Sequence, residues 1–351
     1  MDGLKISDLL KVYEAEIRKN VKHKKKLIKF ERNKFSRIIA IYETLQAGNY
    51  HIKNYSIFLI YEPKCRIIMS LNMEDKIINH YVTRYILMPK LEKYLDYRNV
   101  VTRKNMGSDY AIRFAKKYLE TMKKNDEFYV LKLDISKYFY SIDHEALKSF
   151  LKKDLTDEEY KIVCNIIDST NESYINEKIK NFQRDDLPYY VRGKGIPIGN
   201  MTSQFLSIFY LSFLDHYIIH DLHLPKMIRY MDDYIIFHKD KDYLKVCLSK
   251  IVEKLEKKFK LKCNPKKTKI VKASQGFVFL GYHFKIVKKK TIIKIRSETR
   301  KIIYNTIKRC HKNCNEDNFM YFYSVINNYA YSFKYDKKNK LKDRIENVYK
   351  S

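Results

Sequence analysis

Arg229-Tyr230-Met231-Asp232-Asp233-Tyr234-Ile235-Ile236-Phe237 sets two adjacent carboxylates between two runs of strand-forming residues. This pattern predicts a β-hairpin in which one strand enters from Met227, the two aspartates occupy the turn, and residues 234–237 form the returning strand. Taken alone, an Asp-Asp pair is typical of an ordinary solvated turn. If the pair is buried, it needs a counter-ion, and a divalent cation held by oxygen ligands can supply one.

A third carboxylate lies about a hundred residues upstream of this hairpin. Residues 129–133 have the pattern of a strand that ends at Asp134, and after a turn a helix runs through residues 144–147. An aspartate at the end of one strand, beside a hairpin that carries two more, is the oxygen cluster that two-metal phosphoryl transfer requires, with ions about 3.5–4 Å apart. The sequence therefore predicts a metal centre built from Asp134, Asp232 and Asp233.

Five motifs, in order and spacing, resemble the palm motifs of reverse transcriptases. They are Asp134 with Phe139 five residues on, Gly-Ile-Pro-Ile-Gly-Asn-Met-Thr-Ser-Gln at 195–204, Tyr-Met-Asp-Asp at 230–233, Asn-Pro-Lys-Lys-Thr at 264–268 and Phe-Leu-Gly-Tyr at 279–282. Residues 62–68 resemble the family's fingers segment, in which a basic residue steadies the incoming triphosphate. The similarity is fairly continuous from about residue 29 to residue 287, and the two ends of the chain match only by position.

The form Ile-Gly-x-x-x-Ser-Gln at residues 198–204 is similar to the reverse transcriptases of diversity-generating retroelements. Most other prokaryotic lineages carry Gln where Ile198 stands and Pro where Gln204 stands. The resemblance implies an error-prone RNA-directed DNA polymerase that copies an RNA template into cDNA. It also implies four kinds of partner, namely template RNA, a primer with its cDNA, deoxynucleoside triphosphates and a small basic accessory protein.

The resemblance implies an α+β fold, the right-hand polymerase, with fingers, a palm whose antiparallel sheet is backed by helices, and a small helical thumb. We expect an N-terminal extension and fingers at 1–125, a palm at 126–287 from which 151–190 return to the fingers, and a thumb at 288–351. Periodicity predicts two helices over 4–47, strands within 55–70, and a strand at 291–295. It also predicts helices over 74–95, 108–123, 203–220 and 242–260.

The same resemblance assigns roles to individual residues. Asp134, Asp232 and Asp233 are the expected catalytic residues and ligands of two Mg²⁺ ions, with Mn²⁺ as a substitute and the backbone carbonyl of Ile135 as a further ligand. The expected nucleotide-binding residues are Lys64, Arg66, Ser136, Phe139, Ile198, Gly199, Gln204 and Lys267. The expected primer grip is formed by Leu280, Gly281 and Tyr282.

Three of these assignments have simpler structural alternatives. Lys64 and Arg66 have the pattern of an exposed edge strand with basic residues. Periodicity alone places Phe139 in the core as a packed aromatic. An exposed lysine after Pro265 is an equally simple interpretation of Lys267.

The composition is typical of a nucleic-acid-binding protein. Lys and Arg number 71 against 41 Asp and Glu, which gives a formal net charge of +30 and a pI of about 9.6. An AT-rich coding sequence would inflate the lysine count, but the basic residues are concentrated at 18–37 and 288–301, on either side of the acidic centre. Such flanks are suited to holding a nucleic acid duplex.

The cysteines and the hydropathy pattern indicate a cytoplasmic protein without a membrane segment. The six cysteines are scattered and have no secretory context, which favours reduced thiols. Cys310, His311 and Cys314 resemble half of a zinc site, but no second pair stands at ligand spacing. The most apolar stretch, residues 205–219, is shorter than a membrane span and is interrupted by Asp215.

Two other functions are compatible with the same motifs. A related bacterial reverse transcriptase acting in antiphage defence would share the palm motifs, so the motifs do not separate defence from diversification. A catalytically silent RNA-binding scaffold is the alternative from another class. The three aspartates argue against the scaffold, because clustered acids beside a phosphate backbone weaken binding.

Overall fold

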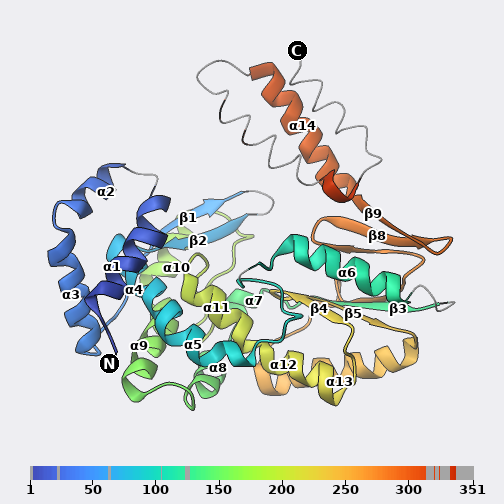
Figure 1. Cartoon of the computed structure of the whole chain (residues 1–351), viewed down its shortest axis with the longest axis horizontal. Coiled ribbons are helices and arrows are strands. Elements are labelled where there is room, and N and C mark those ends of the chain that lie inside the picture. Colours follow the sequence, from blue (N-terminus) through green and yellow to red (C-terminus); the bar gives the residue numbers. More distant parts are fainter. Residues whose placement is uncertain are drawn as a thin grey trace.

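The computed structural model describes residues 3–21, 24–61, 65–103, 105–122 and 127–313, together with 320, 324 and 333–336. Helices and antiparallel sheets are mixed along the chain, so the predicted α+β class is confirmed (Figure 1). The helices are α1 (Ile6–Val12), α2 (Lys24–Glu31), α3 (Lys34–Gln46), α4 (Met73–Tyr81), α5 (Met88–Leu91), α6 (Ser108–Met122), α7 (Tyr138–Ser141), α8 (His144–Leu151), α9 (Asp157–Asp168), α10 (Ser173–Lys180), α11 (Met201–Tyr210), α12 (Ser212–His216), α13 (Lys241–Phe259) and α14 (Ser297–Asn313). The strands are β1 (Ser56–Ile60), β2 (Arg66–Ser70), β3 (Tyr129–Leu133), β4 (Met227–Tyr230), β5 (Asp233–His238), β6 (Lys269–Lys272), β7 (Phe277–Phe279), β8 (Tyr282–Val287) and β9 (Lys290–Ile295).

A four-stranded antiparallel sheet of order β4-β5-β3-β6 forms the centre of the molecule. Successive residues of a strand face opposite sides of its sheet, so the apolar runs of β3 and β5 are divided between two cores. Leu131 and Ile236 belong to the larger core with α11 to α13, whereas Val130 and Ile235 belong to the smaller core with α6. Figure 1 shows α6 on one side of this sheet and α12 and α13 on the other.

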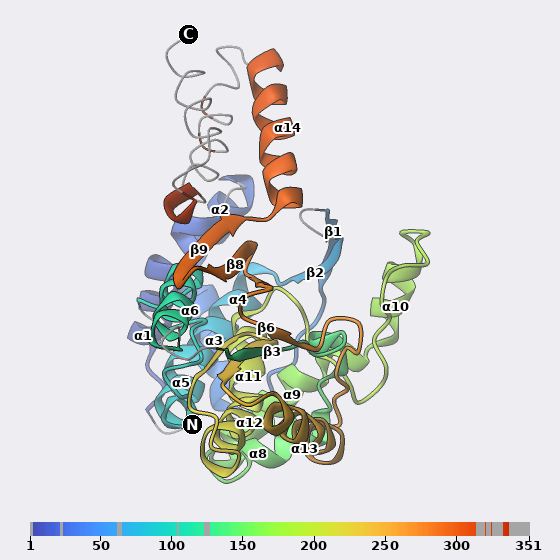
Figure 2. The same ribbon diagram turned by 90° about the vertical axis from the view of Figure 1, so that its right-hand side faces the viewer.

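Two smaller sheets flank the central one. The hairpin β1–β2 pairs Ser56 with Ser70 and Phe58 with Ile68, and the sheet β7-β8-β9 leads into α14. Figure 2 shows α14 extending away from the rest of the molecule. Within the described residues, no helix is long and apolar enough to span a membrane.

Several helices differ from the prediction. The expected pair over 4–47 is divided into α1, α2 and α3, with a π turn at Tyr13–Ile17 and a 3₁₀ turn at Arg18–Asn20. The single helix expected over 203–220 is divided at Leu211, after which α12 continues into a π turn at Tyr217–Asp221. A π turn at Val82–Leu87 likewise interrupts the helix expected over 74–95. By contrast, α6, α13 and β9 lie where they were predicted.

The expected domain limits remain a prediction, but two contacts bear on them. The backbone N–H of Tyr55, just before β1, donates to the hydroxyl of Tyr174 on α10, so the segment 151–190 touches the β1–β2 hairpin. The limit expected between residues 287 and 288 falls inside the hairpin of β8 and β9, where Val287 pairs with Lys290.

Candidate active site

Asp232 occupies a two-residue turn between β4 and β5. Tyr230 pairs with Asp233 across the hairpin, which leaves Met231 and Asp232 as the turn residues. The sequence predicted both aspartates in the turn, but Asp233 is the first residue of β5 and lies outside it. Met231 has a φ of +56°, a conformation that costs a residue with a side chain about 1 kcal/mol or more. The turn is thus strained next to its carboxylate.

Asp134 directly follows β3 and faces the same hairpin. Leu133 pairs with Tyr234, so the register of β3 and β5 brings Asp134 opposite Asp233. The backbone carbonyl of Asp134 accepts the N–H of Asn264 at 2.8 Å, and its side chain is only 9% exposed. Two adjacent antiparallel strands therefore bring Asp134 and Asp233 to one edge of the sheet.

The electrostatics of Asp232 show that the three carboxylates interact. Burial first, and then the neighbouring Asp233 and Asp134 carboxylates, raise the pKa of Asp232 to about 6. Two lysines supply positive charge nearby. Lys267 Nζ lies 2.9 Å from Asp134 Oδ1, and Lys132 Nζ lies 3.9 Å from Asp233 Oδ1. The hydrogen bond to Asp134 raises the pKa of Lys267 above its ordinary value, so this ammonium is more strongly held in its charged form.

The donor set is chemically suited to a hard cation, although the described residues do not form a finished cage. Within the described part of the chain, no three His, Cys, Asp or Glu side chains are grouped so that they could hold a metal ion as they stand. Lys267 instead contacts both oxygens of Asp134, at 2.9 and 3.1 Å. Three mutually repelling carboxylates, one with a raised pKa, are nevertheless the oxygen donors that Mg²⁺ prefers.

The expected sugar and phosphate contacts lie on α7 and β2. Ser136 precedes α7, and its backbone N–H donates to the Lys262 carbonyl at 2.9 Å. Phe139 is half-buried on α7, packed against the larger core. Arg66 is exposed at the start of β2 and acts electrostatically on Tyr140 of α7. Lys64 lies outside the described residues, as do Cys314 and the side chains of Cys310 and His311.

The segment before α11 joins the hairpin β1–β2 to the palm. The Ile198 carbonyl accepts the N–H of Met69 at 2.8 Å. Gly199 has a φ of +123°, and a Cβ there would lie 3.1 Å from the Met69 carbonyl oxygen, so the position requires glycine. Gln204 is exposed on α11, whereas residues 202, 203 and 205–210 of the same helix are buried. Ile198 and Gly199 thus contact β2, and Gln204 lies on the exposed side of α11.

The expected primer grip forms the turn between β7 and β8. Phe279 pairs with Tyr282, and both turn residues have positive φ, +47° at Leu280 and +82° at Gly281. Among the described residues, no atom lies within 4 Å of a Cβ built on Gly281. Lys132 Nζ donates to the Val278 carbonyl at 3.2 Å, which connects this sheet to the lysine beside Asp233.

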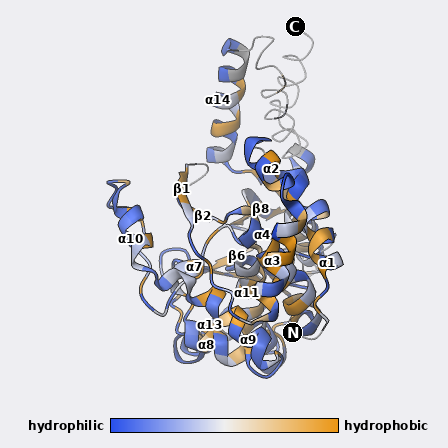
Figure 3. Ribbon diagram, turned by 90° about the vertical axis from the view of Figure 1, so that its left-hand side faces the viewer, coloured by the Kyte–Doolittle hydropathy of each residue, from blue (hydrophilic) through white to orange (hydrophobic). Residues whose placement is uncertain are grey.

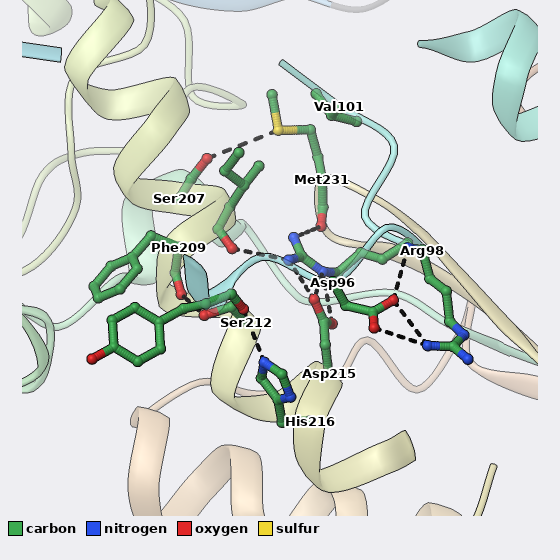
Figure 4. A network of polar contacts seen from close by, with 12 residues as sticks. Asp96, Arg98, Val101, Ser207, Phe209, Ser212, Asp215, His216 and Met231 are labelled. Atoms are coloured by element: carbon green, nitrogen blue, oxygen red, sulfur yellow. Dashed lines mark hydrogen bonds and ion pairs between the residues drawn. The ribbon is translucent and has the colours of Figure 1, made fainter. Parts of the chain in front are cut away.

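Sequence reasoning missed three residues near the hairpin that carries Asp232, namely Arg229, Asp215 and Lys132. Arg229 and Asp215 form a fully buried ion pair, and Arg229 also donates to the carbonyl of Met231 in the turn. Figure 4 labels Asp215 and Met231 within this network. The signal was present, since Asp215 interrupts the most apolar stretch of the chain and a buried charge needs a partner. Lys132 was also overlooked, although it is the polar exception in an apolar strand, two residues before Asp134 and therefore on the same face.

The family model for reverse transcriptase (RNA-dependent DNA polymerase) matches residues 53–284, about two thirds of the chain. The chain belongs to the reverse transcriptase family. The central sheet with its helices is accordingly the palm of a right-hand polymerase, the architecture that the sequence predicted.

Two solved structures are similar to this reverse transcriptase in fold. One is apo telomerase from Candida tropicalis truncated from the C-terminal domain, with 18% identity, a TM-score of 0.49, and coverage of 70% of this chain and 55% of that chain. The other is apo telomerase from the same organism, with 17% identity, a TM-score of 0.49, and coverage of 74% and 53%. The matches thus span about half the length of the telomerase chains. No curated protein matches the chain.

Proposed function

We propose that the protein is an RNA-directed DNA polymerase that copies an RNA template into cDNA. The observation that carries this proposal is the coupling of three carboxylates at one sheet edge, in which Asp232 has a pKa raised to about 6 by burial and then by Asp233 and Asp134. Such repulsion is relieved when divalent cations bind. Asp134, Asp232 and Asp233 would hold two Mg²⁺ ions, with the Ile135 carbonyl as a further ligand and Mn²⁺ as a substitute.

The bound ions would lower the pKa of the primer 3′-hydroxyl and neutralise the leaving pyrophosphate. The chain's own residues then position the nucleotide. Phe139 would lie under the sugar and exclude a 2′-hydroxyl, and Arg66 would bind phosphate oxygens bidentately. Lys267 is charged in the structure, so it has a proton to give to the pyrophosphate once its contact with Asp134 is released.

The subtype proposed is that of the diversity-generating retroelements. It rests on the identity of Ile198, whose carbonyl accepts the N–H of Met69 on β2, and of Gln204, which is exposed on α11. An isoleucine there presents shape without a hydrogen bond, so selection against mismatched bases is weaker than with an amide. The subtype implies a small basic accessory protein as partner. The alternative within the same enzyme class is a related bacterial reverse transcriptase that acts in antiphage defence.

Primer extension on an RNA template with added Mg²⁺ tests the proposed activity. The wild-type protein should extend a DNA primer, and Asp232→Asn should not, because the amide keeps the shape but loses the charge. Asp242→Asn, at an exposed carboxylate on α13, is the matched control and should extend normally. Extension by Asp232→Asn at the wild-type rate would show that the catalytic assignment is wrong.

A further inference from the structure

His144 is a buried histidine whose two ring nitrogens both face oxygen atoms of other segments. It is the first residue of α8, and its side chain is only 1% exposed. Nε2 lies 2.7 Å from the Gly195 carbonyl oxygen, and Nδ1 lies 3.0 Å from Asp168 Oδ1. A carbonyl oxygen can only accept a hydrogen bond, so Nε2 is the donor to Gly195. The ring therefore connects α8 to the end of α9 and to the segment that precedes α11.

Both partners of the ring are held by further contacts. Asp168 is the last residue of α9, and its second oxygen, Oδ2, lies 2.8 Å from Nζ of Lys148. Thr170, just after α9, donates its hydroxyl to the Gly195 carbonyl at 2.8 Å. A carbonyl oxygen has two lone pairs and can accept both donors. The side chains of His144 and Thr170 thus hold one backbone oxygen together.

The segment between α10 and α11 has little regular structure of its own. Residues 181–200, all of which the structure describes, form no helix or strand, so contacts with other segments determine their path. The backbone N–H of His144 donates to the Gly193 carbonyl at 2.9 Å, and Gly193 donates its own N–H to Oδ1 of Asn171 at 2.7 Å. His144 therefore holds this segment through both its backbone and its ring.

Gly195 lets the segment pass close to α7. It has a φ of +85°, and a Cβ there would lie 2.9 Å from Tyr190 Cδ1 and 3.1 Å from the Tyr140 carbonyl oxygen. Glycine adopts this conformation without strain and leaves room for both neighbours. In Figure 3, α7 lies between the β1–β2 hairpin and α8. The bond from His144 therefore fixes the segment at the point where it passes α7.

Beyond Gly195 the segment reaches the expected nucleotide site. The N–H of Ile196 donates to the Phe139 carbonyl at 2.8 Å, and the Ile198 carbonyl accepts the N–H of Met69 on β2, also at 2.8 Å. Phe139 is the proposed sugar gate, and Ile198 is the residue expected beside the nascent base pair. A displaced Gly195 carbonyl would therefore move the backbone that contacts both.

We propose that His144 is a positioning residue for the incoming nucleotide, because its bond to the Gly195 carbonyl holds residues 195–199 against Phe139. The proposal rests on the proposed function, since this segment binds a nucleotide only if the protein is a polymerase. His144 acts through the backbone and does not itself touch the nucleotide. If it served only to pack α8 against α9, its replacement would lower the melting temperature and leave the KM for the nucleotide unchanged.

Two substitutions each keep one of the two ring contacts. A glutamine amide can occupy the position of Nε2, so His144→Gln can still donate to Gly195, whereas the shorter side chain of His144→Asn can reach Asp168 only. In steady-state primer extension, His144→Asn should raise the KM for the deoxynucleoside triphosphate by about 5- to 10-fold, the effect of one lost hydrogen bond. The maximal rate should change less, and His144→Gln should remain close to wild type.

Control variants separate this effect from a general loss of stability. His216→Asn makes the same change at a histidine of α12 whose Nε2 lies 3.0 Å from the Tyr94 carbonyl, outside residues 195–199, and it should keep the wild-type KM. Thr170→Val removes the second donor to the Gly195 carbonyl and should also raise the KM, whereas Thr170→Ser keeps the hydroxyl and should not. Each variant should bind a primer–template duplex without nucleotide as wild type does, which shows that it is folded.

The comparison of the two His144 variants decides the matter. Equal KM values for His144→Asn and His144→Gln would overturn the positioning role, and so would a KM raised only in His144→Gln. If His144→Asn does not fold, Thr170→Val takes its place, and a wild-type KM for that variant would overturn the role as well. A wild-type protein that fails to extend primers would reject the polymerase activity together with this role, whereas normal extension with an unchanged KM in the variants would reject only the role of His144.

Discussion

Arg229 and Asp215 form an ion pair from which solvent is excluded, with Nη2 and Oδ2 2.6 Å apart and both side chains 0% exposed. The guanidinium has two further acceptors, the carbonyl of Ile208 at 2.9 Å and the carbonyl of Met231 at 3.1 Å (Figure 4). Ile208 belongs to the last turn of α11, whose carbonyls lack helical partners. One side chain therefore ties α11 and α12 to the strained residue that precedes Asp232.

Replacing Arg229 alone should destabilise the protein strongly. Arg229→Met leaves the Asp215 charge buried without a partner, which costs about 3–5 kcal/mol. Arg229→Met/Asp215→Leu removes both charges and should recover most of the free energy of unfolding. Chemical denaturation of the two variants measures the difference.

The same pair of variants separates stability from positioning. Even when its stability is restored, the double variant lacks the hydrogen bond that holds the Met231 carbonyl, so the maximal rate of extension should fall, by up to about 100-fold, with little change in KM for the nucleotide. A stable double variant with the wild-type rate would limit Arg229 to a structural role.

In the absence of metal, the ionised carboxylate of Asp232 should lower the free energy of unfolding. Its pKa of about 6 exceeds the ordinary value of 3.8, so between these values the folded state binds more protons than the unfolded state. The free energy of unfolding therefore falls as pH rises from about 4 to about 6 and stays lower above that. In chelator near pH 7.5, Asp232→Asn should melt at a higher temperature than wild type, and near pH 3.5 the two should melt together.

Added Mg²⁺ should reverse this order by binding the folded state. The melting temperature of wild type should rise with Mg²⁺ more than that of Asp232→Asn, whereas the Asp242→Asn control should respond as wild type does. Equal responses from wild type and Asp232→Asn would contradict a role for this carboxylate in metal binding.

The palm was predictable because its signals are local. The apolar runs within residues 129–133 and 227–237 predict the strands β3, β4 and β5, and the aspartates stand at the strand ends. Helix interruptions were not predictable from periodicity. The division of α11 from α12 coincides with the Ile208 carbonyl that bonds to Arg229, a contact made by packing a helix against a distant strand.

The sequence indicated which carboxylates would lie together, but it did not indicate which lysines would lie beside them. Lys267 was assigned from resemblance, and its contact with Asp134 depends on the chain returning to β3 more than 130 residues later. The cavity between the N-terminal helices and the β1–β2 hairpin is likewise lined by Lys26, Phe58 and Lys76, which are separated by tens of residues in the chain. In the sequence, Lys26 is only one of many lysines in a basic stretch, so its position in this cavity could not be predicted.

Phe139 should control the choice of sugar. It is only half-buried, so Phe139→Ala should leave the fold intact and open space for a 2′-hydroxyl. Incorporation of ribonucleotides relative to deoxyribonucleotides should increase, which competition assays on one template measure. Phe139→Tyr keeps the ring and should retain selectivity. An active Phe139→Ala enzyme with unchanged selectivity would show that the ring serves only in packing.

Ile198 should set fidelity opposite template adenine. The Ile198 carbonyl accepts the N–H of Met69, and the Ile198 side chain is half-buried. At its expected position beside the nascent base pair, this side chain can make apolar contacts but no hydrogen bond. A glutamine amide could hydrogen-bond to a correct pair, and a mismatch that left the amide unpaired would be rejected more strongly. Ile198→Gln should therefore lower errors opposite adenine more than opposite other bases, as sequencing of cDNA from one adenine-rich template would show.

If Ile198 only packs against the palm, the buried amide would instead lower stability and reduce all synthesis alike. An active variant with an unchanged error spectrum would reject the fidelity role and leave the polymerase assignment intact.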